Sequence, residues 1–462
     1  MLVFIIASDL SNLDTHPERF CPEAIAPVLP QELIEGALAD AGVRDARRRK
    51  LPTALTVWIV ILLCLFRNRS YRDLIQMLDT ASAWRGLWKD VGSPTSSALS
   101  RARDRVGVAA MQRVYERSAA KWIEESEGED FHGYRLTAID GTCAKVPDTL
   151  KNDAFFGRPG SSRGRAAYPQ LRLVDLMDVG TRLHRAVRVG PYRAAEIALA
   201  RELIQDIPAG LLILLDRNFM SYDLLWDITQ KRSHFIVRAK KNSKARVIRQ
   251  LAPGDALVEI NVPRHWRKDR PDMPRKIRVR EIRYTPEAGK EEIRLFTSLT
   301  DASSIPGLEI ATCYHERWSV ETGFEEVKGR LGAVTTITRP VLLRSKTPER
   351  VLQEVWAHLI AHNVLRRTMV CAASSTPEDE SSKTSEGPAP SRLSFTSTIH
   401  QFRDGIRDMI LLPIHRLIDR YRQLLRDIAR AVVPTRPGRQ FPRAVKIAMS
   451  GYPLKRSARP AA

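Results

Sequence analysis

Residues 211–219 read Leu-Leu-Ile-Leu-Leu-Asp-Arg-Asn-Phe. The five consecutive apolar residues favour a short β-strand that is buried on both faces, as in a parallel sheet. Asp216 follows at the carboxyl end of that strand, where ligands bind in open α/β sheets. The stretch therefore predicts an α/β fold with a ligand site near Asp216. Considered alone, an aspartate in this position is more often a turn or cap residue.

The neighbouring segments support the α/β prediction. Short apolar runs of strand length alternate with segments of helical periodicity, which is typical of this class. Residues 241–300 differ, because apolar and basic residues alternate there, and we expect them to form an inserted, basic β-rich region. The predicted strands are 134–139, 171–177, 183–189, 211–215 and 234–239, and the predicted helices among them are 194–205 and 222–231.

The remaining segments suggest helical regions on either side. Residues 1–130 carry apolar residues at helical spacing and predict an all-α N-terminal domain, which we expect to bind DNA. The α/β domain would then span 131–371, ending in a helix-rich block. Residues 372–395 are rich in Ser, Pro, Glu and Thr and predict a flexible linker. Residues 396–462 predict a helical C-terminal region with a basic tail.

The composition favours a nucleic-acid partner. Lysine and arginine number 74 against 53 acidic residues, which gives a formal net charge of +21. Such an excess attracts polyanions, although some ribosome-associated and anion-handling proteins are equally basic. The five cysteines are scattered without a CxxC pair, which argues against a disulfide framework or a zinc site and favours the cytoplasm. The longest apolar stretch, 51–66, is shorter than the ~20 residues of a membrane span, so we expect no membrane association.

A second strand-end aspartate is Asp140. It follows the apolar run 136–139, and Gly141 after it permits close approach of a ligand or another backbone segment. An Asp-Gly pair after a strand is, by itself, usually a turn.

The most informative segment is 314–328. On a helix with ~100° per residue, Arg317, Glu321 and Lys328 lie ~60°, ~20° and ~40° to one side of Tyr314, and together they form one polar stripe. A solvated charged face with an Arg317–Glu321 ion pair is the simpler interpretation. It leaves Tyr314 and the adjacent Trp318 unexplained.

These residue types suit phosphodiester chemistry. Two aspartates and one glutamate supply oxygen ligands for two Mg²⁺ ions, which stabilise the attacking and leaving oxygens, and Mn²⁺ suits the same ligands. Arg317 and Lys328 would bind DNA phosphates, and Tyr314 would add a hydrogen bond to a phosphate. Trp318 would stack on an unpaired base.

The order Asp140, Asp216, Glu321, with the signature Tyr-x2-Arg-x3-Glu-x6-Lys, resembles the insertion-sequence-4 family of bacterial DDE transposases. The run 216–219 and the segment 157–170 are also similar to that family. The resemblance implies an RNase H-like catalytic domain, with the β-rich insertion between its last strand and the glutamate-bearing helix. It further implies a homodimer that binds terminal inverted repeats, cleaves and joins double-stranded DNA by cut-and-paste transposition, and acts in the cytoplasm at the bacterial nucleoid. By the same likeness, Trp318 is a candidate to support a flipped base.

Four further arginines are candidate DNA contacts. Arg101 and Arg103 lie in a segment whose serines and Thr95 are suited to cap a helix, and a solvated surface helix is equally compatible. Arg158 and Arg163 lie in a Gly/Ser-rich loop after the first strand, where an exposed flexible loop is the other interpretation.

Three alternative functions remain open from the residues. A nuclease of the same fold shares the three acids but does not join strands. An inactive or regulatory relative binds DNA ends without cutting them. A basic structural protein of the nucleoid would need no metal, and this alternative does not explain the polar stripe.

Overall fold

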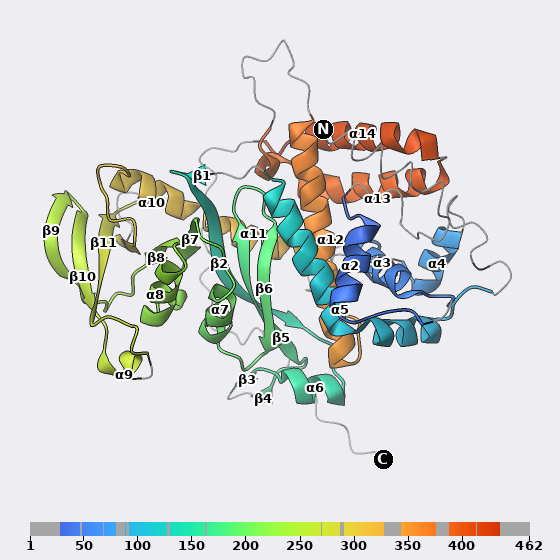
Figure 1. Cartoon of the computed structure of the whole chain (residues 1–462), viewed down its shortest axis with the longest axis horizontal. Helices are drawn as coiled ribbons and strands as arrows, with labels where there is room; N and C mark the ends of the chain where they lie inside the picture. The colour runs from blue at the N-terminus through green and yellow to red at the C-terminus, as the bar shows by residue number, and fades with distance from the viewer. Residues whose placement is uncertain are drawn as a thin grey trace, which may run out of the picture. The chain divides into compact units, whose positions relative to one another are not determined.

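The computed structural model describes residues 28–46, 49–67, 69–79, 88, 92–126, 130–161, 164–268, 270–286, 291–327, 343–375, 388–412 and 414–434. The chain divides into two compact units. We call them the helical unit (Met1–Ser126, Ala144–Gln170 and Glu325–Ala462) and the sheet unit (Glu127–Cys143 and Leu171–Phe324). Figure 1 labels the elements of both.

The sheet unit contains the predicted α/β elements and the β-rich region. Its helices are α7 (Glu196–Ile204), α8 (Tyr222–Gln230), α9 (Arg264–Arg267), α10 (Gly307–His315) and α11 (Trp318–Glu325). Its strands are β1 (Asp130–Phe131), β2 (Tyr134–Lys145), β5 (Gln170–Asp178), β6 (His184–Pro191), β7 (Leu211–Leu215), β8 (His234–Arg238), β9 (Arg246–Ala252), β10 (Asp255–Asn261), β11 (Lys276–Tyr284) and β12 (Ile293–Thr297). The end of β2 and the first residue of β5 lie beyond the unit boundary.

Within the described residues these ten strands form one mixed sheet, in the order β6-β5-β2-β7-β8-β12-β11-β10-β9, with β1 paired to β2. The centre is parallel, because β7 runs parallel to both β2 and β8. The flanks are antiparallel: β5 pairs with β6, and β12 to β9 form a meander. The predicted insertion is therefore β-rich, and it continues the central sheet through the β12–β8 pair.

The continuous apolar run of β7 is explained by cores on both faces of the sheet. Ile213 and Leu215 pack in one core with side chains of α7 and α8. Leu212 and Leu214 pack in the other core with side chains of α10 and α11. Successive residues of a strand point to opposite faces, so a strand covered on both sides must be apolar throughout.

The helical unit is built around the long helix α12 (Pro348–Ser374), which packs against neighbouring helices from both ends of the chain (Figure 1). Its other elements are α2 (Gln31–Asp40), α3 (Thr53–Leu65), α4 (Tyr71–Asp79), α5 (Ser96–Glu124), α6 (Leu150–Phe156), β3 (Gly160–Ser161), β4 (Gly164–Arg165), α13 (Phe395–Leu411) and α14 (Ile414–Arg430).

The predicted domain boundaries differ from this division. Residues 144–170 and α12, both placed by the sequence in the α/β domain 131–371, belong to the helical unit. The reason is side-chain packing: α12 is buried almost all round, and its Trp356 ring lies 5.1 Å from that of Tyr115 on α5. Helical periodicity alone does not show which elements a buried helix packs against.

The predicted apolar helix at 53–66 is α3, and it is buried on nearly every side. A helix that is apolar all round belongs in a core or a membrane. Among the described residues, none of the helices combines the length and apolar character that a membrane crossing requires. Of the predicted linker, α12 covers the first residues to Ser374, and residues 376–387 lie outside the described chain, as does the basic tail from 435.

Candidate active site

The two aspartates lie at adjacent positions of the central sheet. In the parallel pair of β2 and β7, Ile139 lies opposite Leu215. Asp216 directly follows the last residue of β7, as expected, whereas Asp140 lies inside β2, which continues to Lys145 beyond the predicted strand end. Because neighbouring strands are only ~4.8 Å apart, the pairing brings the two carboxylates to the same place.

Asp216 is held by the backbone that follows it. Its carboxylate accepts hydrogen bonds from the amides of Asn218 (2.7 Å) and Phe219 (3.3 Å) and from the Asn218 side chain (3.1 Å). It thereby caps the short 3-10 helix η1 (Arg217–Phe219). Asn218 was quoted in the sequence motif but given no role there; the structure shows that it orients this carboxylate.

Arg317 connects the first aspartate with the glutamate. Its guanidinium lies 3.6 Å from Asp140 Oδ2 and donates a 3.1 Å hydrogen bond to Glu321 Oε1. The Arg317 side chain is largely buried and lies over the Trp318 ring, at 4.9 Å from its centroid. The Arg317–Glu321 contact is the simple i,i+4 pair, but the same arginine also holds an acid from a distant strand.

The electrostatics show that the three acids interact. The pKa of Asp140 is raised to about 6. Burial is the main cause of the rise, to which the charges of Asp216 and Glu321 add, while the Gly141 amide and Arg317 oppose it. A carboxyl surrounded by other carboxylates releases its proton reluctantly. Perturbed carboxyls of this kind are enriched at functional sites.

The predicted single helix across 314–328 is wrong. Helix α10 ends at His315, a turn follows at Glu316 and Arg317, and α11 begins at Trp318. Tyr314 therefore does not continue the polar stripe. Its ring is buried in the core, its hydroxyl donates to the Leu215 carbonyl (3.2 Å), and burial raises its pKa to about 12.

Tyr314 thus has a different position from the one expected. The predicted hydrogen bond from Tyr314 to a phosphate does not fit a hydroxyl that is buried and already bonded to the last residue of β7. The structure instead ties α10 to the strand end that precedes Asp216. Trp318 is 45% exposed, as a base-stacking side chain needs to be. Lys328 lies outside the described residues.

Helix α11 is seated tightly against the sheet. A Cβ on Gly323 would lie 2.1 Å from Met177 Cε of β5. The Phe324 ring stacks on His184 of β6, and His184 is bonded to the buried Asp175 (2.6 Å). These contacts fix the helix that carries Glu321. Asp175 and His184 lie on neighbouring strands, so their contact is not evident from the local sequence.

Gly141 has a similar steric requirement. A Cβ at this position would lie 2.8 Å from the carboxyl carbon of Glu196, which is bonded to Arg172. The predicted close approach at Gly141 is thus made by a side chain of α7. Neither Glu196 nor Arg172 was expected at the site.

The donor set of Asp140, Asp216 and Glu321 suits a hard divalent cation, because all of its ligand atoms are carboxylate oxygens. Within the described part of the chain, no group of three His, Cys, Asp or Glu side chains is already arranged as a metal-ligand cluster. Arg317 neutralises two of the three acids here. The 42% exposure of the Glu321 side chain leaves it room to turn.

Two of the other predicted DNA contacts are corrected by the structure. The Arg158 side chain is fully buried and pairs with Asp148 and Asp153, so it stabilises its own loop and has no surface to offer a phosphate. Arg103 bonds to Gln353 and to Ser345, which commits it to the packing of α5 on α12.

The remaining two predicted arginine contacts are not decided by the structure. Arg101 is exposed on α5, whose first turn is capped by Thr95 as expected. Arg163 lies outside the described residues.

Comparison with known proteins identifies the family. Residues 131–364 match the family model described as a transposase DDE domain, and residues 23–116 match the N-terminal model of insertion element 4 transposases. The chain is also 31% identical over 432 residues to transposase InsG of insertion sequence element IS4 from Escherichia coli (strain K12), covering 92% of each chain. The chain belongs to the IS4 family of DDE transposases.

Two further matches accompany this one. The putative transposase InsZ of Escherichia coli (strain K12) is 29% identical over 295 residues, covering 60% of this chain and 96% of the relative. A solved piggyBac transposase in a synaptic complex with hairpin DNA matches with a TM-score of 0.42 at 11% identity, covering 90% of this chain and 86% of that one.

This IS4-family protein is a DNA transposase, an enzyme of a family that catalyses DNA cleavage and strand transfer. Membership of the DDE family also implies dependence on a divalent metal. Family membership therefore excludes the structural nucleoid protein considered above.

Proposed function

We propose that Asp140, Asp216 and Glu321 are the catalytic acids of this transposase and hold two Mg²⁺ ions, or Mn²⁺ in their place. The observation that carries the proposal is their convergence: two aspartates at adjacent positions of parallel strands, and a glutamate that shares Arg317 with the first of them. Bound ions would supply charge stabilisation for the attacking and leaving oxygens of the phosphodiester.

The protein's own residues prepare this site. Asn218 and the amide of Phe219 fix the Asp216 carboxylate, and the Gly141 amide donates to Asp140 Oδ1 (2.7 Å). Such pre-organisation removes the cost of ordering ligands during the reaction. Asp140 must lose its proton to act as a ligand, so its raised pKa favours activity above about pH 6.

Arg317 and Trp318 form the DNA-facing part of the proposed site. With Asp140 and Glu321 holding metal ions, the Arg317 guanidinium would be available to bind a DNA phosphate. Trp318, exposed beside it, offers its ring to an unpaired base at the cut end. The substrate of this reaction would be the terminal inverted repeats of an insertion sequence, bound by a homodimer during cut-and-paste transposition.

The sheet supports an RNase H-like catalytic domain with the β9–β12 region inserted before the glutamate-bearing helix. In this arrangement the acids come from two central parallel strands and from a helix that packs on the sheet. The β-rich meander β9–β12 belongs to the same continuous sheet.

The test is cleavage and joining of a DNA fragment that carries the element's own ends, with Mg²⁺, Mn²⁺ or EDTA. We expect nicked, hairpin or joined products that require metal and disappear with Glu321→Gln. The matched control is Glu325→Gln, an exposed glutamate one turn further along α11, which should retain activity. Binding of the ends with no product from the wild type would instead identify an inactive, regulatory relative. Cleavage without joining would identify a nuclease.

A further inference from the structure

Helix α6 of the helical unit carries two exposed apolar side chains. Leu150 is 90% exposed and Phe155 is 54% exposed. With ~100° per residue, Leu150, Lys151, Ala154 and Phe155 fall within an arc of ~140°, opposite the buried Asn152 and Phe156. We call the four exposed residues the α6 face. Isolated surface apolar residues are common, whereas two large ones on the exposed face of one short helix suggest a contact surface.

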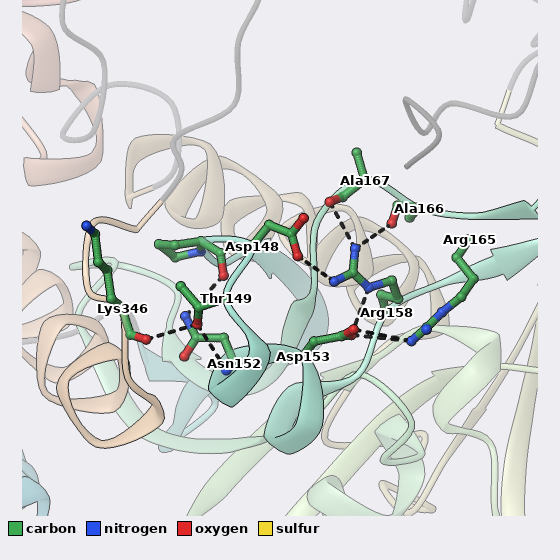
Figure 2. Close-up of polar contacts among 10 residues, drawn as sticks. Asp148, Thr149, Asn152, Asp153, Arg158, Arg165, Ala166, Ala167 and Lys346 are labelled. Atoms are coloured by element: carbon green, nitrogen blue, oxygen red, sulfur yellow. Dashed lines mark hydrogen bonds and ion pairs between the residues drawn. The ribbon is translucent and has the colours of Figure 1, made fainter. Parts of the chain in front are cut away.

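The α6 face is held by a fixed support. Thr149 accepts a hydrogen bond from the Asn152 amide (3.2 Å) and donates one to the Lys346 carbonyl (2.9 Å). The Asn152 side chain donates to the carbonyls of Pro147 and Ser345. Figure 2 shows the bonds of Thr149 to Asn152 and to Lys346, which lies in the segment that precedes α12. The apolar side chains are therefore presented by an anchored helix.

The charges around α6 leave its surface positive. Buried Arg158 pairs with Asp148 and Asp153 and also donates to the carbonyls of Ala166 and Ala167, as Figure 2 shows. The local acids are thus already neutralised. Lys151 lies between the two apolar residues on the arc and is exposed. Arg165, which pairs with Asp153 at 3.4 Å, is still 60% exposed. Residues 144–170 contain five basic and two acidic residues, a net charge of +3.

We propose that the α6 face is a DNA-contacting surface of this transposase, outside the carboxylate site. Leu150 and Phe155 would lie against deoxyribose and base edges, and Lys151 and Arg165 against phosphates. Apolar side chains that enter a groove between basic phosphate contacts are a recurrent way of holding a duplex. The inference rests on the proposed function only in requiring that the chain binds DNA.

A second copy of the chain fits this face less well. Lysine is depleted in protein–protein interfaces, yet Lys151 lies between the two apolar residues. A stable dimer buries on the order of 800 Å² per partner, far more than two side chains of a seven-residue helix provide. The positive charge is complementary to a polyanion.

Site-specific photocrosslinking tests the proposal directly. The full chain carries benzoylphenylalanine at position 155, in a Glu321→Gln background so that the DNA stays intact. The control carries it at Leu308, which is 79% exposed near the start of α10. We expect covalent attachment to a short fluorescein-labelled duplex with one element end from position 155 and not from 308. Chain-to-chain adducts, or no adduct while a gel shift shows bound DNA, would overturn the proposal.

Substitutions give a second, independent measurement. Leu150→Ser with Phe155→Ser should weaken duplex binding at least several-fold without changing the thermal midpoint, because both side chains are exposed. Leu308→Ser should leave affinity unchanged. Equal affinity of the double variant and the wild type would refute the proposal. If the wild type binds no duplex in the gel shift, both this proposal and the proposed binding of DNA ends are wrong. If it binds duplex but yields no cleaved or joined product, only the assignment of the catalytic acids is affected.

Discussion

At the scale of single residues, the raised pKa of Asp140 has a consequence for stability. Its pKa rises from 3.8 to about 6 on folding, so the folded chain holds this proton more tightly than the unfolded chain. Ionisation of Asp140 therefore opposes folding, and the cost grows as pH rises from about 4 to about 6 and is constant above that. The proposed catalytic site would therefore be maintained at the expense of stability.

Asp140→Asn should remove this cost. We expect the metal-free variant to be more stable than the wild type at pH 7.5, by on the order of 1–3 kcal/mol, and to be no more stable near pH 4. Thermal melts in EDTA measure the difference. Added Mn²⁺ should raise the melting temperature of the wild type and leave the variant unchanged. Equal stability of the two proteins at both pH values would show that folding does not raise the pKa of Asp140.

Individual site residues were partly predictable from the sequence. Asp140 and Asp216 stood out because each follows an apolar strand, and parallel strands bring such ends together. Arg158 was misjudged because a basic residue in a Gly/Ser-rich loop looks exposed. Its partners Asp148 and Asp153 lie only ten and five residues earlier, and their spacing was a signal that the arginine could be neutralised within its own loop.

At the scale of elements, the seating of α11 depends on the absence of a side chain at Gly323. Alanine normally stabilises a helix by ~1 kcal/mol relative to glycine. Here its Cβ would overlap the end of the buried Met177 side chain. Gly323→Ala should therefore destabilise the protein by about 1–3 kcal/mol and slow DNA cleavage by displacing Glu321.

A double-mutant cycle isolates this contact. Met177→Ala alone costs about 2–5 kcal/mol because it leaves a cavity, but it also makes room for the new methyl group. The double variant should lose less than the sum of the single losses, with a coupling of at least ~0.5 kcal/mol in urea unfolding. Strictly additive losses would mean that Met177 does not limit the approach of α11.

A buried ion pair fixes the segment after α11 within the helical unit. Glu326 bonds to His362 (3.1 Å) and Arg366 (3.0 Å) of α12, and all three are essentially inaccessible to solvent. Burial alone would raise the pKa of Glu326, but Arg366 and His362 lower it well below its usual range. Loss of the carboxylate would leave the Arg366 charge buried without its partner.

Glu326→Gln should therefore cost about 3–5 kcal/mol of unfolding free energy. The adjacent exposed Glu325 provides the matched control, and Glu325→Gln should change stability by less than about 0.5 kcal/mol. Urea unfolding of the two variants measures the contrast. Similar small losses in both would show that the cluster contributes no specific stability.

Most helices and strands were predictable from the sequence, but the elements against which they pack were not. Apolar periodicity located β5, β6, β7, β8, α7 and α8 to within two residues, whereas β2 continues six residues past its predicted end at 139. It predicted one helix across 314–328, whereas a turn at Glu316–Arg317 separates two helices. The turn places Arg317 beside Asp140, a contact 177 residues away in sequence that local periodicity does not contain.

At the scale of the whole molecule, the net charge of +21 should dominate DNA affinity. Each phosphate neutralised releases condensed counterions, so affinity falls steeply as salt rises. For six or more phosphate contacts we expect a loss of about 10³-fold or more between about 50 and 200 mM salt. Fluorescence anisotropy with a labelled duplex gives the slope. An affinity that barely changes with salt would mean that the basic surface does not contact the backbone.

The central claim is that Asp140, Asp216 and Glu321 act as one metal-dependent catalytic unit. The most direct measurement is the single-turnover rate of DNA end cleavage in Asp140→Asn, Asp216→Asn, Glu321→Gln and the Asp140→Asn/Glu321→Gln double variant. We predict that each single change lowers the rate by at least about 10³-fold and that the double variant is no slower than the worse single one, because members of one catalytic unit are not additive. A single variant that stays within about tenfold of the wild type, or losses that multiply in the double variant, would contradict the account.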